Sequence, residues 1–229
     1  MLYMSSVDPN RHHLETLSEI RSLMERSSRF ISLSGLSGVV AGIAALLGAA
    51  LVYAYLGVNP FNQERPYFVM APEINKWGMD YLTFFVLDAV GVIVLALSFG
   101  IFFTTRKARR KGQKVWDALT RRLLVSLGIP LVTGGLFCLA LLKYGWIGLV
   151  APATLIFYGL ALINAAKYTL RDVHYLGLCE IVLGLLATFR MGFGLEAWVI
   201  GFGFLHIIYG VWMYNKYEAG ENKQESVGP

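Results

Sequence analysis

Charge is what this sequence has least of. Only 15% of its 229 residues are Asp, Glu, Lys or Arg, against about 25% in ordinary soluble domains. Such a low charged fraction excludes an intrinsically disordered chain, which combines many charges with few apolar residues. It also excludes an ordinary water-soluble domain and, despite a pI of 9.2, a nucleic-acid-binding domain.

Cysteine is also rare, and the common catalytic motifs are missing. The two cysteines, Cys138 and Cys179, lie inside apolar stretches without metal-type spacing, which predicts reduced, buried thiols and no disulfide framework. The sequence contains no HExxH, GxxxxGK[ST], GxSxG or GxGxxG motif, and no cluster of His, Cys and carboxylates at metal spacing. We therefore infer no catalytic residue, no metal ion and no cofactor, and catalysis is the function class with the least support.

Long apolar runs take the place of these features. Uncharged stretches cover 30–56, 123–142 and 144–166, and each can cross a hydrocarbon core of about 30 Å. Three further runs each carry one ionisable group inside the span: Asp88, Glu180 or His206. We predict an all-α, polytopic membrane bundle of six transmembrane helices. The predicted spans are 30–56, 81–104, 123–143, 147–166, 173–190 and 195–214.

The distribution of basic residues predicts the orientation. Sixteen of the 20 Lys and Arg residues fall before the first span, between spans two and three, between four and five, or after the sixth. Cytoplasmic flanks retain such residues, so both termini should face the cytoplasm. The richest segment is also a candidate contact for anionic lipids or for a cytoplasmic partner protein. Its candidate residues are Arg106, Lys107, Arg109, Arg110, Lys111 and Lys114.

Three segments are predicted to lie outside the bilayer. In residues 1–29, Asp8 and Pro9 precede apolar residues at helical spacing, which indicates an amphipathic cytoplasmic helix. This helix could lie at the membrane interface, pack beneath the bundle or bind a partner helix. Residues 57–80 contain three prolines among aromatic residues, which favours an ordered external cap or a ligand-binding lid. Residues 216–229 form a polar tail that we expect to be disordered.

Glycines recur seven residues apart in the first, third and fifth spans, as Gly35/Gly42, Gly128/Gly135 and Gly177/Gly184. Seven residues are two helical turns, so both glycines of a pair share a helix face. This pattern suggests three tandem hairpins that enter and leave the membrane on the cytoplasmic side. The face with Ser34, Gly38 and Gly42 could form a homodimer contact or could pack within the monomer.

Two resemblances follow from these strings. The hairpin repeat, clearest over 127–167, resembles the duplicated repeats of acid-resistance membrane proteins of the HdeD type. The stretch "LETLSEIRSLMERSSRFISLSGLSG" is similar to small bacterial multi-pass proteins of unassigned function. These resemblances imply a multi-pass protein of the bacterial inner membrane and do not imply a mechanism.

Glu180 and His206 are the most informative candidate site. An ionisable side chain inside a membrane costs roughly 2.5–3.5 kcal/mol on insertion scales, so each one needs a reason. Both residues lie at a similar depth and have glycines three residues before and four after. We predict that the fifth and sixth helices pack antiparallel on these glycines, with Gly177 against Gly210 and Gly184 against Gly203, which brings carboxylate and imidazole together.

Two other intramembrane residues attract attention. Asp88 lies in the outer third of the second span, with Arg190 as a possible ion-pair partner, and completes the candidate polar site. Pro130 should kink the third helix, because proline removes one backbone hydrogen bond.

Two functions therefore compete. The first is a non-catalytic membrane scaffold or sensor subunit that engages a partner protein or anionic lipid at its cytoplasmic surface. The alternative is a small proton-linked transporter or pH sensor that uses the Glu180 and His206 pair. A transporter should have a water-accessible cavity that reaches Glu180, whereas a scaffold should bury this residue in a dry site.

Overall fold

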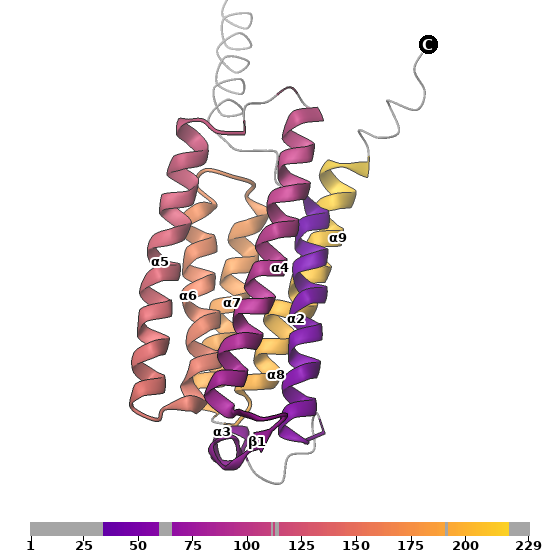
Figure 1. The fold of residues 1–229 in the computed structure, drawn as a ribbon. Helices are drawn as coiled ribbons and strands as arrows, with labels where there is room; N and C mark the ends of the chain where they lie inside the picture. The colour runs from indigo at the N-terminus through magenta and orange to yellow at the C-terminus, as the bar shows by residue number, and fades with distance from the viewer. Residues whose placement is uncertain (1–33, 60–65, 111, 113–114, 191, 220–229) are drawn as a thin grey trace, which may run out of the picture.

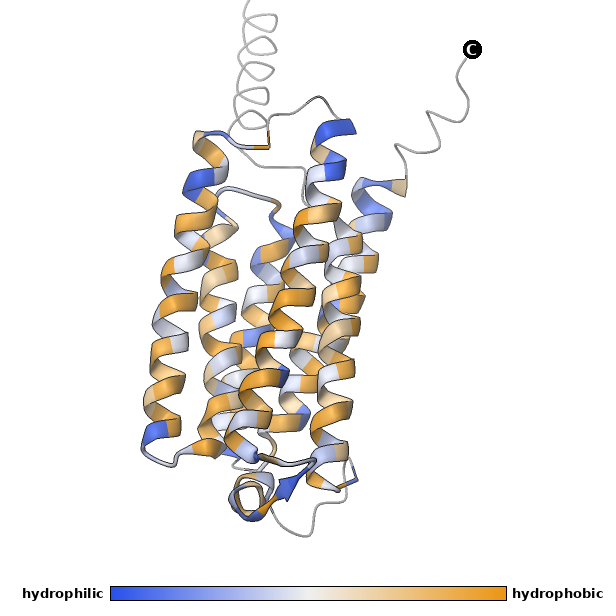
Figure 2. Cartoon of the chain, in the orientation of Figure 1, coloured by the Kyte–Doolittle hydropathy of each residue, from blue (hydrophilic) through white to orange (hydrophobic). Residues whose placement is uncertain are grey.

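The computed structural model of the chain describes residues 34–59, 66–110, 112, 115–190 and 192–219. In this part of the chain six helices are long and apolar enough to cross a membrane, and they lie side by side in one bundle (Figure 1). Apolar residues cover most of their length and polar residues gather at the two ends (Figure 2). The predicted all-α bundle of six membrane spans is thus confirmed. The spans are Gly35–Leu56, Tyr81–Arg110, Ala118–Lys143, Ile147–Ala165, Asp172–Phe189 and Gly194–Tyr217.

The helices that form these spans are labelled in chain order. They are α2 (Gly35–Leu56), α4 (Tyr81–Arg110), α5 (Ala118–Lys143), α6 (Val150–Ala165) with the preceding 3₁₀ turn η2 (Ile147–Leu149), and α7 (Asp172–Phe189). The last span consists of α8 (Gly194–Trp198), the π-helical segment η3 (Val199–Leu205) and α9 (His206–Tyr217). We call the end of the bundle where α2, α5 and α7 begin the basic end, and the opposite end the capped end.

Two outer helices differ in length from the prediction. α4 continues to Arg110 instead of 104, and α5 begins at Ala118 instead of 123. The extra turns contain arginine, lysine and leucine, which are good helix formers, and the polar segment between the spans is correspondingly shorter. The predicted amphipathic helix over 1–29 lies outside the described residues, as do Lys111 and Lys114.

α6 and α7 pack on glycines. A Cβ on Gly159 would lie 2.5 Å from the carbonyl oxygen of Gly177, and a Cβ on Gly177 would lie 2.7 Å from the carbonyl oxygen of Gly159. The same two positions contact Ile181 and Ile163, each four residues after the facing glycine. Because glycine has no side chain, the two backbones approach closely enough for extensive van der Waals contact, which is the main source of helix association in lipid.

α2 and the last span also pack on glycines. A Cβ on Gly35 would lie 2.4 Å from the carbonyl oxygen of Gly210, and one on Gly42 would lie 2.7 Å from that of Gly203. Gly38 also faces the backbone of Gly210, at 3.2 Å. The glycine face of α2 therefore packs within the monomer, which is one of the two arrangements that the sequence allowed.

The third glycine pair of the sequence pattern has a different environment. A Cβ on Gly128 or on Gly135 would meet nothing within 4 Å, whereas one on Gly134 would lie 2.4 Å from Phe157 of α6. Of the three spans in the sequence pattern, α2 and α7 thus use the seven-residue glycine spacing for helix packing, whereas α5 does not. The similarity of the three strings did not predict equivalent surroundings.

Pro130 is accommodated by a side chain from the neighbouring helix. Proline has no N–H, so the carbonyl oxygen four residues earlier, on Ser126, loses its helical donor. The Asn164 side chain of α6 donates to this oxygen, with an Nδ2 to O distance of 2.8 Å. Lys167 in turn donates to Asn164 Oδ1 at 3.1 Å. The polar residues at the end of α6 therefore satisfy the backbone of α5.

The capped end carries the loop between α2 and α4, and its described residues, 57–59 and 66–80, are folded as predicted (Figure 1). Its described part contains α3 (Tyr67–Met70), the 3₁₀ turn η1 (Ala71–Glu73) and a hairpin of β1 (Asn75–Lys76) and β2 (Met79–Asp80). The Tyr55 hydroxyl of α2 donates to the carbonyls of Ile74 and Met79 at 3.1 and 2.9 Å. Its ring stacks on Phe84 of α4, with centroids 4.0 Å apart, so Tyr55 holds the hairpin against two membrane helices.

At the basic end, the last turn of α9 and the following Glu218 contact α7, α2 and α4. Lys216 Nζ lies 3.0 Å from both carboxylate oxygens of Asp172 on α7, and the Tyr217 hydroxyl donates to Asp172 at 2.5 Å. Glu218 accepts a hydrogen bond from the Gly35 backbone N–H of α2 at 2.7 Å and pairs with Lys107 of α4 at 3.2 Å. Residues 216–218 of the predicted tail are therefore ordered, because these ionic contacts hold them.

The start of α5 gives a testable pH effect. Asp117 is its N-cap and accepts from the Thr120 backbone N–H at 2.7 Å. This hydrogen bond favours the ionised carboxylate and holds the pKa of Asp117 below its ordinary value. Asp117→Ala should lower the free energy of unfolding by about 1 kcal/mol at neutral pH.

The sign of the pH dependence follows from the lowered pKa. The ionised cap stabilises the fold above an unfolded-state pKa of about 3.9, and this contribution is lost as the pH falls through the folded-state pKa. Thermal unfolding in mild detergent at several pH values measures it. Asp117→Asn, which keeps an acceptor oxygen, is the control. A difference between alanine and aspartate that stays the same down to pH 2 would contradict the prediction.

Candidate functional site

Glu180 and His206 meet inside the bundle. Glu180 lies on α7 and its side chain is completely buried, while His206 begins α9 and is 5% exposed. Glu180 Oε1 lies 3.4 Å from His206 Nδ1. The structure therefore brings together the two residues that their common depth in the sequence had placed side by side.

The glycine contacts predicted to produce this pair were wrong. Gly177 faces Gly159 of α6 rather than Gly210, and Gly210 faces α2. Gly184 likewise packs on α6, and Gly203 packs on Leu46 of α2. Each glycine face thus has a different partner helix, and Glu180 contacts the last span at Gly201 and His206.

Gly201 makes room for the carboxylate. A Cβ on this residue would lie 2.4 Å from Glu180 Oε2 and 2.5 Å from Leu155 of α6. Gly201 lies in η3, a π-helical segment, and such segments occur often at functional sites. The missing side chain lets the last span touch the carboxylate directly with its backbone.

His206 is hydrogen-bonded at both ring nitrogens. Nδ1 lies 3.0 Å from the carbonyl oxygen of Gly201, and Nε2 lies 2.8 Å from the Tyr158 hydroxyl of α6. A carbonyl oxygen only accepts, so Nδ1 carries the proton and donates. In the neutral imidazole Nε2 then accepts from Tyr158, and in the imidazolium Nε2 donates to the same hydroxyl oxygen. We call Glu180, His206, Tyr158 and the Gly201 backbone the Glu180 cluster.

The Glu180 carboxyl group itself receives no hydrogen bond from the described residues. Neither Oε1 nor Oε2 has a hydrogen-bond partner among the described residues. A charged carboxylate without donors is strongly disfavoured in a low-dielectric interior, and here His206 is the nearest source of positive charge. Two proton arrangements keep the cluster neutral overall: a carboxylic acid beside a neutral imidazole, or a carboxylate beside an imidazolium.

Tyr158 and Gly201 were not found by sequence reasoning. A tyrosine in the middle of an apolar span was an available signal, because a buried phenol hydroxyl needs a hydrogen-bond partner. Aromatic rings complete this side of the cluster: the Phe202 ring lies 5.0 Å from Tyr158 and 5.8 Å from His206. Gly201 had no distinguishing signal, since glycine is common throughout the spans.

Asp88 is not part of this cluster. It lies on α4, where its two carboxylate oxygens are 3.3 Å from the position a Cβ would take on Gly48 of α2. The proposed pairing with Arg190 was wrong: no ion pair joins these two described residues, and the Arg190 guanidinium instead lies over the Phe193 ring at 5.7 Å. The reason is packing, because α4 lies against α2 whereas Arg190 follows α7, which lies against α6.

Only part of the predicted basic contact surface is exposed. Arg106, Arg109 and Arg110 are exposed on the last turns of α4. Lys107 is buried, with its side chain 10% exposed in the ion pair with Glu218. It acts inside the fold, and the accessible described candidates for a lipid or partner contact are the three arginines.

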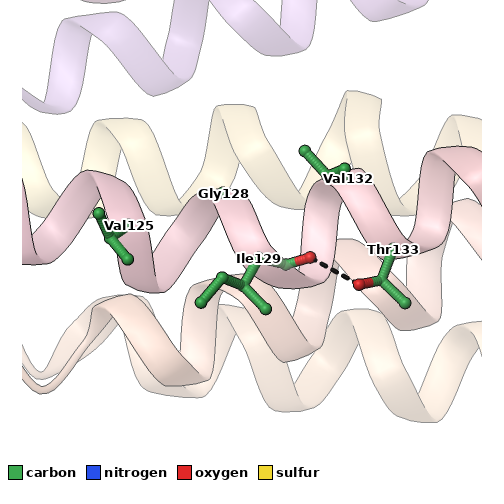
Figure 3. Close-up of a pocket in the computed structure, with 5 residues that line it drawn as sticks. All are labelled: Val125, Gly128, Ile129, Val132 and Thr133. Atoms are coloured by element: carbon green, nitrogen blue, oxygen red, sulfur yellow. Dashed lines mark hydrogen bonds between the residues drawn. The ribbon is translucent and has the colours of Figure 1, made fainter.

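Other features of the described residues lie apart from the cluster. A shallow hollow of about 430 Å³ on the outer face of α5 is lined by apolar side chains and by Thr133, which donates to Ile129 (Figure 3). Within the described part of the chain, no group of three or more His, Cys, Asp and Glu side chains is arranged to hold a metal ion. Cys138 is buried as predicted, whereas Cys179 is exposed on α7, contrary to the prediction.

No protein-family model, no curated protein and no solved structure matches this chain.

Proposed function

We propose that this integral membrane protein is a proton-responsive sensor subunit, with the Glu180 cluster as its sensing element. The observation that carries the proposal is the position of Glu180. Its side chain has no exposed surface and lies 3.4 Å from His206, at the start of the helix that joins α2, α4 and α7 at its other end. A buried titratable pair between α7 and the start of such a helix is suited to converting protonation into movement.

The sensing step follows from electrostatics. The neutral pair holds one exchangeable proton between Glu180 and His206, and loss or gain of a proton leaves a net charge in a dry site. Net charge in a low-dielectric site is costly, so the pair should separate or admit water when its proton count changes. Since Nδ1 already carries a proton, His206 gains one only at Nε2, by way of the Tyr158 hydroxyl.

The response has a direct route to the basic end. α9 runs from His206 to Tyr217, a rise of roughly 17 Å at 1.5 Å per residue. Its last residues hold Asp172 of α7, and Glu218 binds the first N–H of α2. A shift of α9 away from Glu180 would strain these contacts and change the surface that presents Arg106, Arg109 and Arg110.

We place this surface in the cytoplasm, because basic residues are enriched on the cytoplasmic side of membrane proteins. We propose that it binds a partner protein or anionic lipid. A bacterial inner-membrane location agrees with the family resemblances. Complete burial of Glu180 favours sensing over the alternative, proton-linked transport, because a transporter needs a water path to its proton site on at least one side of the membrane.

The test uses the full chain in lipid nanodiscs across a pH series. Infrared difference spectra report the carboxylic-acid carbonyl band of Glu180, and hydrogen exchange, corrected for the intrinsic pH effect, reports the protection of residues 34–42 and 205–219. Glu180→Gln is the key variant, because it keeps the shape but cannot titrate. Asp88→Asn is its matched control in another helix.

A sensor should show a pH-dependent change in protection at the basic end that disappears in Glu180→Gln and survives in Asp88→Asn. Identical protection at every pH in the unmodified chain would overturn the proposal. Proteoliposomes with an entrapped pH dye separate the two functions: proton flux that needs Glu180 would identify a transporter instead.

A further inference from the structure

The second membrane carboxyl group, Asp88, lies in a setting quite different from that of Glu180. It follows the start of α4 at Tyr81 by seven residues, which is about 10 Å along the helix, within the apolar part of the span. Its side chain is partly exposed. On α2, Leu47 and Leu51 lie one residue before and three residues after Gly48 and are 60% and 53% exposed, so the helix surface next to Gly48 is apolar and accessible.

The helix against which Asp88 packs supplies no charge to balance it. α2, the helix against which it packs, contains no Asp, Glu, Lys, Arg or His, and its titratable side chains are Tyr53 and Tyr55, near the capped end. Tyr55 is already committed to the carbonyls of Ile74 and Met79. Among the described residues Asp88 has neither an ion pair nor a hydrogen bond.

Gly48 provides the space that the carboxyl group occupies. A Cβ at this position would lie 3.3 Å from both Asp88 oxygens and 2.4 Å from Val92. The Asp88 side chain therefore reaches α2 at Gly48, where the facing residue has no side chain. An ionised carboxylate in this apolar setting would be stable only with a bound counter-charge, whereas a carboxylic acid needs none.

We infer that Asp88 is a second proton-binding site, separate from the Glu180 cluster, that holds its proton in the membrane and is open to small lipophilic ligands from the lipid side of the α2–α4 seam. The Glu180 cluster is closed to such ligands, since Glu180 has no exposed surface. The two carboxyl groups thus differ in access, and this difference can be measured chemically.

A lipophilic carbodiimide is the appropriate probe. The carboxyl proton passes to one nitrogen of the reagent while a carboxyl oxygen bonds to its central carbon, giving an O-acylisourea. The acyl group then moves from oxygen to nitrogen, which gives a stable N-acylurea. The adduct keeps every atom of both reactants and nothing is oxidised or reduced, so its mass gain equals the mass of the reagent.

The experiment treats the full chain in phosphatidylcholine vesicles with N,N′-dicyclohexylcarbodiimide and locates adducts by peptide mass spectrometry. We expect an adduct on Asp88 and none on Glu180. Labelling should fall about tenfold per pH unit once the carboxyl group ionises, because the fraction of protonated carboxyl groups falls by the same factor. Asp88→Asn should abolish the adduct, Gly48→Ala should slow its formation by placing a methyl group against both oxygens, and Gly91→Ala, which meets no atom within 4 Å, should not.

Three results would overturn the inference. These are no adduct on Asp88 while a transmembrane peptide with one glutamic acid is labelled in the same vesicles, an Asp88 adduct independent of pH, or equal labelling of Glu180. Circular dichroism of each variant confirms that the helices are kept. None of these readouts depends on sensing by Glu180, so this inference can fail or hold independently of the proposed function.

Discussion

Alanine at Gly159 or Gly177 should destabilise the bundle strongly, whereas alanine at Gly128 or Gly135 should not. At the first two positions the new methyl group would lie 2.5–2.7 Å from a backbone carbonyl oxygen of the facing helix. Backbone cannot rotate away as a side chain can, so α6 and α7 must move apart. Overpacking of this kind costs about 1–3 kcal/mol, and loss of the close contact along both helices adds to it.

The two control glycines lie on α5, which is also a membrane-spanning helix. A Cβ on Gly128 or Gly135 meets no atom within 4 Å, so alanine there should leave the free energy of unfolding unchanged or raise it by about 0.5–1 kcal/mol through better helix propensity. Thermal or denaturant unfolding of the four variants in one detergent gives the comparison. Equal destabilisation at all four positions would show that glycine matters here for reasons other than helix packing.

His206→Leu should be the most damaging single change in the Glu180 cluster. It removes the partner of the Tyr158 hydroxyl and of the Gly201 carbonyl at once, and it takes away the imidazole that lies beside Glu180. An unsatisfied buried polar group costs about 1–3 kcal/mol, so a loss of roughly 2–5 kcal/mol is expected for the group as a whole. Unfolding by denaturant in mild detergent measures this loss.

Two matched variants separate polar from apolar effects. Phe202→Leu removes a ring that contacts both Tyr158 and His206 but leaves every hydrogen bond in place, so its cost should be smaller, about 1 kcal/mol. Glu180→Leu should cost less than His206→Leu, because it removes a carboxyl group that accepts no hydrogen bond in the described structure. If His206→Leu costs no more than Phe202→Leu, the hydrogen bonds of His206 contribute little.

Both proposed proton sites follow from the cost of an ionised carboxylate in an apolar environment. They differ in the groups that surround the carboxyl group. Glu180 shares its site with an imidazole and has no contact with solvent or lipid, so its protonation is linked to the position of α9. Asp88 faces Gly48 and is partly exposed, so its protonation is linked to the membrane around it. One residue can therefore respond to the conformation of the protein and the other to its lipid environment.

The sequence by itself determined the number of spans, their approximate bounds and the residues that need an explanation. Lipid offers no hydrogen bonds to the backbone, so a long apolar run has almost no alternative to a spanning helix. The same one-dimensional reasoning placed Glu180 and His206 at equal depth, since depth depends only on the distance in residues from the helix ends.

Tertiary structure alone decided which faces meet. Gly177, Gly184, Gly203 and Gly210 could pair in several ways that are equivalent in the sequence, and only the packing of all six helices selected α6 for the first two and α2 for the others. It likewise decided that Tyr158 reaches His206 and that Lys107 pairs with Glu218. Small residues permit close contact without specifying a partner, so partners are fixed by the fit of the whole bundle.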